Sequence, residues 1–353
     1  MFDETHYVPI LKAKRGEMQA LRTASELTRE RLTPLVEAPY VDSADAKPGT
    51  IAPVLERLPG VLEDACGADP FFLDLGLVAS DPALAAGEHP VAQVFAEARK
   101  RDLQAIPVTD LRRDEDFEDA IGEVVLADGR GLCVRLDAED FDDIDAALDE
   151  VDEIVGRLDL TPEDVDLVLD FGDIEPRQAG SLGLVAAGLI SPLRHLGDWR
   201  TLTLAATSFP RVADFGADSL NTAPRAEWAL WDRLRERNLG RIPTFSDYGI
   251  TGVQAAEPGT ASMFAPSPNL RYSTDTDYIV YKARHPRHGY EQFNALCAKI
   301  VTRPEFRGAD FSAGNAYISR CAAGTDGPGN ASKWIEAGTS HHLTVVTTQL
   351  STL

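Results

Sequence analysis

Short apolar runs, each ending in a charged or hydroxyl residue, recur along roughly the first 250 residues of the chain. Their central residues stand 26 to 40 positions apart, about the length that a strand, a helix and two connecting loops need. This spacing predicts an α/β fold of the (β/α)8 TIM-like barrel type. The eight runs are YVPILKAK (from Tyr7), LTPLVEAPY (from Leu32), PFFLDLG (from Pro70), LQAIPVTD (from Leu103), LCVRLD (from Leu132), VDLVLDFGD (from Val165), TLTLAATS (from Thr201) and IPTFSDYG (from Ile242).

The repeating pattern changes after the eighth run. Residues 251–329 contain Pro/Gly-rich segments, one expected strand in RYSTDTDYIVYKARHP, one expected helix near EQFNALCAKIV, and a turn-rich stretch that ends at GPGN. The closing segment, ASKWIEAGTSHHLTVVTTQL, has a helical period and is predicted to form the eighth barrel helix. We therefore predict a single domain over residues 1–353. Residues 251–329 are expected to be inserted between strand 8 and helix 8 as a lid over the C-terminal mouth, where loops assemble sites in this architecture.

The net charge of −23 is unevenly distributed along the chain. Residues 101–170 hold 24 Asp and Glu against 6 Lys and Arg. Within DAEDFDDIDAALDEVDEIVGRLD the apolar residues recur at helical spacing, so the acids are expected on the solvated face of an amphipathic helix. Such a surface repels phosphates, which argues against extended nucleic-acid binding on that flank. Residues 271–320 hold 8 Lys and Arg against 5 acids, so an anion-binding surface is expected there instead.

No segment predicts membrane insertion, secretion or a cysteine-based site. The start, MFDETHYVPILKAKRG, lacks a basic stretch followed by an apolar core, and no apolar run approaches the roughly 18 residues that span a bilayer. We therefore expect a cytoplasmic protein without a membrane segment. Cys66, Cys133, Cys297 and Cys321 stand far apart without C-x-x-C spacing, so we expect reduced thiols and neither a zinc site nor disulfides.

The charged residues that end the strands are the main candidates for chemistry. Because the carboxyl ends of barrel strands meet at one face, we expect these side chains to converge at the mouth. Lys12 and Lys14 are two residues apart in an extended strand and should point the same way. Ser208 and Ser246 end strands in the same way. The expected ring consists of Lys14, Glu37, Asp74, Asp110, Arg135, Asp137, Asp170 and Asp247.

Three interpretations of this ring are open. It could be an ion-pair network that satisfies itself. It could hold Mg²⁺ or Mn²⁺ through the carboxylates of Asp74, Asp137 and Asp170, because these cations prefer oxygen ligands. It could also be a general acid/base set beside a cationic substrate anchor. The catalytic candidates in that case are Lys14, Glu37, Asp110, Arg135 and Asp247.

Two segments outside the ring could bind an anion. The basic turn RHPRHGY brings positive charge near the tyrosines of the insertion, which suits an anionic or nucleotide-like ligand or a protein partner, although a solvated turn would have the same composition. The turn GTDGPGNASK places Asn330 and Lys333 at a helix start, which is either a plain N-cap or a phosphate site. Adjacent His341 and His342 leave a helix in different directions and are expected to pack or lie at the surface. The candidates in the basic turn are Arg284, His285, Arg287 and His288.

Several segments resemble the bacterial and phage "beta family" proteins over nearly the whole chain. They are YVPILKAKRGEMQAL with PLVE about twenty residues on, SFPRV, RAEWALW, SDYG, PEFRGADFSAGNAYI and GNASKWIEAGTSHH. The resemblance implies a context of phage–host conflict. It supplies no catalytic residues.

Two functions of different classes follow as expectations. The first is a binding subunit of an antiphage or phage-encoded system, in which the mouth and the basic turn hold a protein partner or a small anionic ligand. The second is a metal-dependent phosphoester hydrolase with the carboxylate cluster at the mouth. No H-E-x-x-H, G-x-S-x-G or G-x-G-x-x-G motif occurs, so zincin, α/β-hydrolase and dinucleotide-binding folds have no support.

Overall fold

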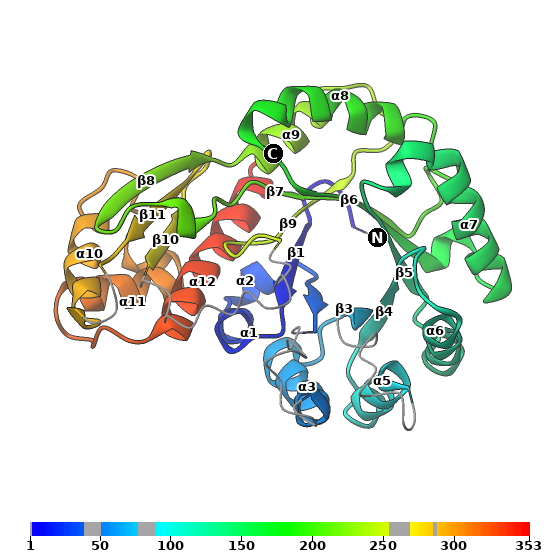
Figure 1. Ribbon diagram of the computed structural model, residues 1–353, viewed down its shortest axis with the longest axis horizontal. Coiled ribbons are helices and arrows are strands. Elements are labelled where there is room, and N and C mark those ends of the chain that lie inside the picture. The colour runs from blue at the N-terminus through cyan, green and yellow to red at the C-terminus, as the bar shows by residue number, and fades with distance from the viewer. Residues whose placement is uncertain (1, 39–50, 77–88, 254–268, 285–287) are drawn as a thin grey trace.

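Eight parallel strands close into a barrel, as the spacing of the apolar runs predicts. The computed structural model describes residues 2–38, 51–76, 89–253, 269–284 and 288–353. The strands follow one another round the barrel in chain order, and β9 closes it by pairing with both β7 and β1 (Figure 1). Their bounds are β1 Tyr7–Lys12, β2 Leu35–Glu37, β3 Phe71–Asp74, β4 Ala105–Thr109, β5 Leu132–Leu136, β6 Val165–Asp173, β7 Thr201–Thr207 and β9 Thr244–Asp247.

Helices surround the barrel. Side chains cap several of them: Asp114 accepts the Phe117 amide at the start of α6, and Gly129, with a φ of 60°, ends it. The helices are α1 Arg15–Arg22, α2 Glu26–Arg29, α3 Ile51–Cys66, α5 Pro90–Lys100, α6 Glu115–Asp128, α7 Ile144–Arg157, α8 Ala179–Ile190, α9 Ala226–Arg235 and α12 Ala331–Leu350. Short 3-10 turns occur at Asp140–Asp143, Pro162–Asp164, Pro176–Gln178, Val212–Asp214 and Ala309–Phe311. The prediction that the last segment is the eighth barrel helix is confirmed, because α12 packs against α1 and β1.

Alternation along each strand decides which side chains face the barrel interior. One set of alternate residues fills the interior, and the other set packs outward against the helices. In β1, for example, Val8 and Ile10 point inward whereas Leu11 joins the outer core. A polar residue at a strand end reaches the mouth only when it continues the inward set. The inner cluster comprises Val8, Ile10, Leu35, Phe72, Val108, Cys133, Val168, Ala205 and Tyr248.

The insertion forms a small sheet with helices on the side of α12. The expected strand is a hairpin, β10 Asn269–Ser273 and β11 Asp277–Lys282, and the expected helix is α10 Gln292–Ile300. The sheet also takes an unpredicted third strand, β8 Ser219–Pro224, from the connection after β7. A further helix, α11 Ala313–Ala322, occupies the stretch that the sequence describes as turn-rich.

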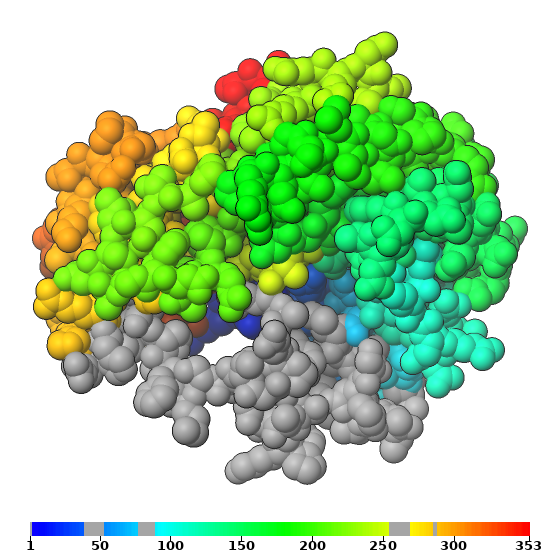
Figure 2. All heavy atoms as spheres, turned by 45° about the horizontal axis from the view of Figure 1, so that its top comes forward, coloured from blue at the N-terminus to red at the C-terminus, as the bar shows by residue number. Residues whose placement is uncertain are grey.

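The described part of this insertion lies beside the barrel (Figure 1). In the space-filling view the green atoms of the connection after β7 lie against the yellow and orange atoms of the insertion, as the pairing of β8 with β11 requires (Figure 2). Of the described residues of the insertion, Gly252 and Val253 at its start lie at the mouth. A lid over the mouth stays a prediction.

The remaining expectations concern membranes and cysteines. Within the described ranges, no helix has both the length and the apolar content to cross a bilayer. All four cysteines are free and buried, in agreement with the expected thiols.

Candidate functional site

A cavity of about 430 Å³ opens at the carboxyl ends of the barrel strands. Its charged lining comes mainly from strand ends, as expected for this architecture. Lys12, Glu37 and Asp74 lie in register on β1, β2 and β3, so they form one layer of the wall. The lining residues are Lys12, Glu37, Asp74, Asp110, Arg113, Arg135, Asp137, Ala138, Glu139, Asp170, Phe171, Gly172, Tyr248 and Val253.

Arg135 stands at the centre of a carboxylate cluster. Its Nη1 lies 3.0 Å from Glu37 Oε1 and 3.1 Å from Asp74 Oδ2. Its Nε donates to Asp170 Oδ2 at 2.8 Å. Burial disfavours the charged guanidinium, but the surrounding tyrosine and carboxylates outweigh this and raise the pKa of Arg135. The arginine therefore stays charged and satisfies three acids at once.

Tyr248, the residue directly after β9, completes this cluster. Its hydroxyl donates to Asp170 Oδ2 and accepts from Arg135 Nη2. Burial and then the charge of Asp170 raise the pKa of Tyr248 well above its usual value, so the phenol stays protonated. This tyrosine was not among the predicted site residues, although it continues the inward alternation of Thr244 and Ser246.

The strand-end aspartates are held by a recurring turn. Asp74, Asp170 and Asp247 each precede x-Gly, and one oxygen of each accepts the glycine amide at 2.8, 2.9 and 2.8 Å. Gly172 and Gly249 adopt left-handed φ values of 60° and 58°, which favour glycine. In Asp74 and Asp170 this turn fixes one oxygen on the backbone and directs the other toward Arg135.

Two arginines of the β4–α6 loop neutralise the rim of the mouth. Arg113 Nη2 lies 2.6 Å from Asp110 and 3.6 Å from Asp74, and its guanidinium covers the Phe117 ring. Arg112 pairs with Asp137. Neither arginine was predicted, because the loop sequence has no period that would reveal where its side chains point.

Lys12 is the lysine of the mouth. Its Nζ donates to the carbonyl of Gly252 at 3.0 Å, and its side chain is largely buried. Burial lowers the pKa of Lys12, and the charges of Glu37 and Glu17 oppose this shift. Lys14 was expected at the mouth too, but it is exposed and immediately precedes α1. The chain turns after Lys12, with the Lys14 amide bound to the Lys12 carbonyl at 2.6 Å, so the strand alternation no longer applies.

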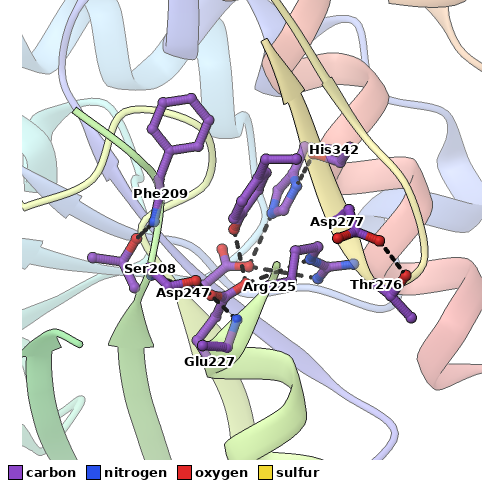
Figure 3. A network of polar contacts seen from close by, with 12 residues as sticks. Ser208, Phe209, Arg225, Glu227, Asp247, Thr276, Asp277 and His342 are labelled. Carbon is purple, nitrogen blue, oxygen red and sulfur yellow. Dashed lines mark hydrogen bonds and ion pairs between the residues drawn. The ribbon is translucent and has the colours of Figure 1, made fainter. Parts of the chain in front are cut away.

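The expectation that Asp247 converges on the mouth is wrong. It follows Phe245 on the outward side of β9 and is fully buried between the barrel and α12 (Figure 3). Tyr7 and His342 bind its carboxylate, and Arg225 Nη2 lies 3.9 Å away. Burial raises the pKa of Asp247, but the positive charges and hydrogen bonds around it outweigh burial and lower it overall.

Ser208 also belongs to this buried region. Its Oγ donates to Glu227 at 2.5 Å, and Glu227 also accepts from Tyr278 at 2.8 Å. Arg225 lies 3.4 Å from Glu227 and donates to the Thr274 carbonyl at 3.1 Å, so the network ties the insertion to the barrel. We name this set the buried network; it comprises Tyr7, Ser208, Arg225, Glu227, Asp247, Ser273, Tyr278 and His342. Figure 3 labels Ser208, Arg225, Glu227, Asp247 and His342 of this set.

The buried network contains serine, histidine and aspartate in a line. Ser273 Oγ lies 2.7 Å from His342 Nδ1, and His342 Nε2 lies 2.9 Å from Asp247 Oδ2. These residue types match a nucleophilic triad. All three are at most 1% exposed, and none is among the residues that line the mouth cavity. Because a substrate cannot reach the hydroxyl, we interpret the line as structural.

The anion-binding candidates of the insertion do not join the mouth. Arg284 is 62% exposed and pairs with Asp218 at 2.8 Å, and His288 is exposed. His285 and Arg287 lie outside the described residues. Asn330 caps α12 by accepting the Lys333 amide at 3.0 Å, as the plain N-cap interpretation predicts. Lys333 pairs with Glu336 and covers the Tyr317 ring. None of the described candidates lines the cavity.

The described residues of the mouth do not form a ready ligand set for a divalent cation. Asp74 and Asp170 are engaged by Arg135, and Asp137 is engaged by Arg112. In the part of the chain that the structure describes, no group of three or more His, Cys, Asp or Glu side chains is arranged to hold a metal. The self-satisfied ion-pair interpretation therefore describes the carboxylates best, and it leaves the open volume and Lys12 unexplained.

Comparisons with known proteins support the family and say little more. The family model described as Beta protein matches residues 7–348. No curated protein matches. Among solved structures, a variant of the tryptophan synthase α-subunit from Pyrococcus furiosus is 16% identical with a TM-score of 0.42, covering 70% of this chain and 89% of that one. Another structure of that subunit is 17% identical with a TM-score of 0.40, covering 71% and 90%. The barrel assignment rests on the strand order itself.

Proposed function

The chain belongs to the beta protein family, and from this premise we propose that it acts as a binding subunit in a phage–host conflict system, holding a small polar ligand in the barrel mouth. One observation carries the proposal. Arg135 fills the centre of the carboxylate cluster, yet about 430 Å³ remains open beside it, with the Lys12 ammonium in its wall. A preformed concave site with a few convergent polar groups is the usual form of a small-molecule site.

The charge of the lining narrows the ligand class. Among the described lining residues, three cationic side chains face six carboxylates, and this excess of negative charge disfavours a polyphosphate. A ligand with several hydrogen-bond donors fits the carboxylates, and a single anionic or carbonyl group fits Lys12. The Phe171 and Tyr248 rings offer apolar surface. A nucleoside or nucleoside monophosphate has these properties, so the nucleotide-like ligand expected from the sequence becomes one with at most one phosphate.

Thermal unfolding with a ligand panel tests the proposal. We expect a nucleoside or nucleoside monophosphate to raise the melting temperature of the wild-type protein, because a ligand that binds only the folded state stabilises it. Lys12→Met should abolish this increase, and Lys14→Met should preserve it, since Lys14 lies outside the cavity. The proposal fails if no compound in the panel shifts the melting temperature, or if both variants respond as the wild type does.

Infection tests the biological context separately. In cells that carry the complete locus, we expect Lys12→Met to change phage plating efficiency and Lys14→Met to leave it unchanged. Equal plating with wild type, variants and a deletion of the gene would contradict a role in phage–host conflict.

The metal-dependent phosphoester hydrolase has weaker support. Its carboxylates would have to exchange Arg135 for the metal, and such an exchange exposes a buried arginine. Release of p-nitrophenol from bis(p-nitrophenyl) phosphate with Mn²⁺, lost in Asp170→Asn, would favour the hydrolase over the binding subunit.

A further inference from the structure

Among the described cations of the mouth, Lys12 differs in that no described carboxylate pairs with it. Its Nζ has one hydrogen bond in the described chain, to the Gly252 carbonyl, and no described carboxylate lies within 4.0 Å of it. Arg135 and Arg113, by contrast, each pair with at least two acids. Two of the three donor positions of the ammonium therefore remain for a ligand in the cavity.

The surroundings of Lys12 favour its neutral amine more than those of a surface lysine do. The side chain is 9% exposed and continues the inward set of Val8 and Ile10, so its stem is enclosed by the barrel. Burial lowers the pKa of Lys12, and Lys14 and Arg135 act in the same direction, while Glu37 and Glu17 oppose them. A desolvated lysine in an open cavity is the usual setting of a nucleophilic amine.

We propose that Lys12 forms a Schiff base with a small aldehyde or ketone held in the mouth cavity. This inference deepens the proposed function and rests on the small polar ligand that it places in the mouth cavity. Among such ligands it selects a carbonyl compound in place of a nucleoside, because a nucleoside has no free aldehyde or ketone to meet Lys12. The lining is suited to a polyhydroxylated carbonyl compound, whose hydroxyls can donate to the surrounding carboxylates.

Glu37 is positioned to move the proton. It is the register partner of Lys12 on β2, its charge acts on the Lys12 ammonium, and Arg135 Nη1 donates to only one of its oxygens, Oε1. In the reaction, Glu37 takes one proton from the ammonium through a water molecule in the cavity, because more than 4.0 Å separates the two groups. The neutral nitrogen then attacks the carbonyl carbon. A proton passes from nitrogen to the former carbonyl oxygen, giving a carbinolamine. Glu37 then returns its proton to the hydroxyl, which leaves as water while nitrogen forms the C=N bond. One ammonium and one carbonyl thus give one protonated imine and one water.

Reductive trapping tests the proposal directly. The full chain is incubated at pH 7 with glyceraldehyde, and in parallel with pyruvate, in the presence of sodium cyanoborohydride, which reduces an imine to a stable secondary amine. Peptide mass spectrometry then locates the label among the seven lysines of the chain. We expect at least tenfold more label on Lys12 than on exposed Lys14 with one or both probes. In Lys12→Arg the label at position 12 should vanish. In Lys14→Arg the label on Lys12 should persist.

The wild-type map alone decides the matter if a variant fails to fold. Label spread equally over Lys14 and the other lysines, or absent from Lys12, overturns the Schiff base. If Lys12 is unlabelled but nucleosides still raise the melting temperature, the Schiff base fails and the binding function stands. If Lys12 is labelled and no nucleoside binds, the ligand class proposed above is wrong and the reactive amine stands. A Glu37→Gln variant should slow labelling at Lys12 without changing that at Lys14.

Discussion

Arg135 and Arg225 are both surrounded by carboxylates and tyrosines. They differ in whether an open cavity borders the cluster. Arg135 at the mouth contacts Glu37, Asp74, Asp170 and Tyr248, and 15% of its side chain is exposed to the cavity. Arg225 in the buried network lies near Glu227 and Asp247 and has no exposed surface. The first cluster borders an open volume, and the second is sealed by α12 and the insertion.

The difference shows that an arginine surrounded by carboxylates forms part of the candidate site at the mouth and stabilises the fold in the buried network. Arg225 also donates to the Thr274 carbonyl and, at 2.6 Å, to Gln349 Oε1, so it joins the barrel, the insertion and the last helix. Arg135 joins only strand ends of one barrel. Removing a partner from a sealed cluster leaves a buried charge, whereas water can enter an open one. Substitutions in the two clusters and on the surface test this distinction.

The largest effect is expected from Arg225→Met. The change leaves Glu227 and Asp247 without their cation in a region that water does not reach, and the free energy of unfolding should fall by about 3–5 kcal/mol. Urea unfolding measures the loss. Arg235→Met, at the exposed end of the adjacent helix α9, removes a one-quarter-exposed arginine and should cost less than about 1 kcal/mol. Equal losses in the two variants would refute the idea that sealing makes the difference.

A second effect appears as acid sensitivity of the sealed region. His341 is fully buried on α12, stacks on Tyr272 with ring centroids 3.8 Å apart, and binds the Ser273 carbonyl at 2.7 Å. Burial, and to a smaller extent the nearby positive groups His342, Arg307 and Arg225, lower its pKa to about 3 from an ordinary 6.5. The hydrogen bond to the Ser273 carbonyl opposes this shift but does not cancel it. Between these values the unfolded chain binds a proton that the folded chain does not. Stability should therefore fall as the pH drops below 6.5, by up to about 1.4 kcal/mol per pH unit.

The measurement compares the pH slopes of wild type and variants between pH 6.5 and 4. His341→Phe should flatten the slope, and His195→Gln, which changes a histidine whose side chain is 43% exposed, should not. Asp247 does not affect the slope between pH 6.5 and 4, because its pKa lies below the ordinary 3.8. The stability that its carboxylate contributes is present above that pH and is lost only as the pH falls through the lowered value. An unchanged slope in His341→Phe would mean that the ring is hydrated in the folded protein.

The third prediction concerns the open cluster. Arg135→Met should cost only about 1–2 kcal/mol, because water in the cavity can hydrate Glu37, Asp74 and Asp170. It should also create a cation site, since oxygens of all three acids converge on the vacated position. Mn²⁺ at one hundredfold its dissociation constant would add about 2.7 kcal/mol to the variant. Wild type and Arg225→Met should gain nothing, the latter because the ion cannot enter. Stabilisation of the wild type by Mn²⁺ would revive the hydrolase.

The barrel could be predicted from the sequence because each strand is short and buried on both faces, and therefore appears in the sequence as an apolar run. The parts of the insertion that escaped prediction lack such a signal. β8, with the sequence SLNTAP, alternates half-buried and exposed residues and becomes a strand only by pairing with β11, which is distant in the chain. Gly308 and Gly314 flank the start of α11, so the segment was described as turns.

The site was predicted in part for a related reason. Knowing that strand ends meet at one face located Glu37, Asp74, Asp110, Arg135 and Asp170 at the mouth. The prediction did not establish which side chains at the strand ends point into the barrel. Counting alternate residues from Val8 selects Lys12, and counting from Thr244 selects Tyr248 instead of Asp247. The loop arginines have no such count, because their direction depends on a turn that the sequence does not specify.

The smallest change in stability is expected from replacing the most exposed of the three arginines, Arg284. Arg284 is 62% exposed and pairs with Asp218 on the surface of the insertion, where water and salt screen the interaction. Arg284→Ala should leave the urea midpoint unchanged within error, which would complete a series of three arginines whose importance to stability follows their burial.

The Arg284→Ala variant also allows the basic turn to be tested separately as a partner surface, because the fold and the mouth of the variant remain intact. If Arg284→Ala together with His288→Ala lowers capture of a protein encoded in the same locus while the ligand response of the mouth persists, the turn and the mouth are separate sites. A measurable stability loss from Arg284→Ala would instead mean that this pair supports the insertion and that burial alone does not rank the three arginines.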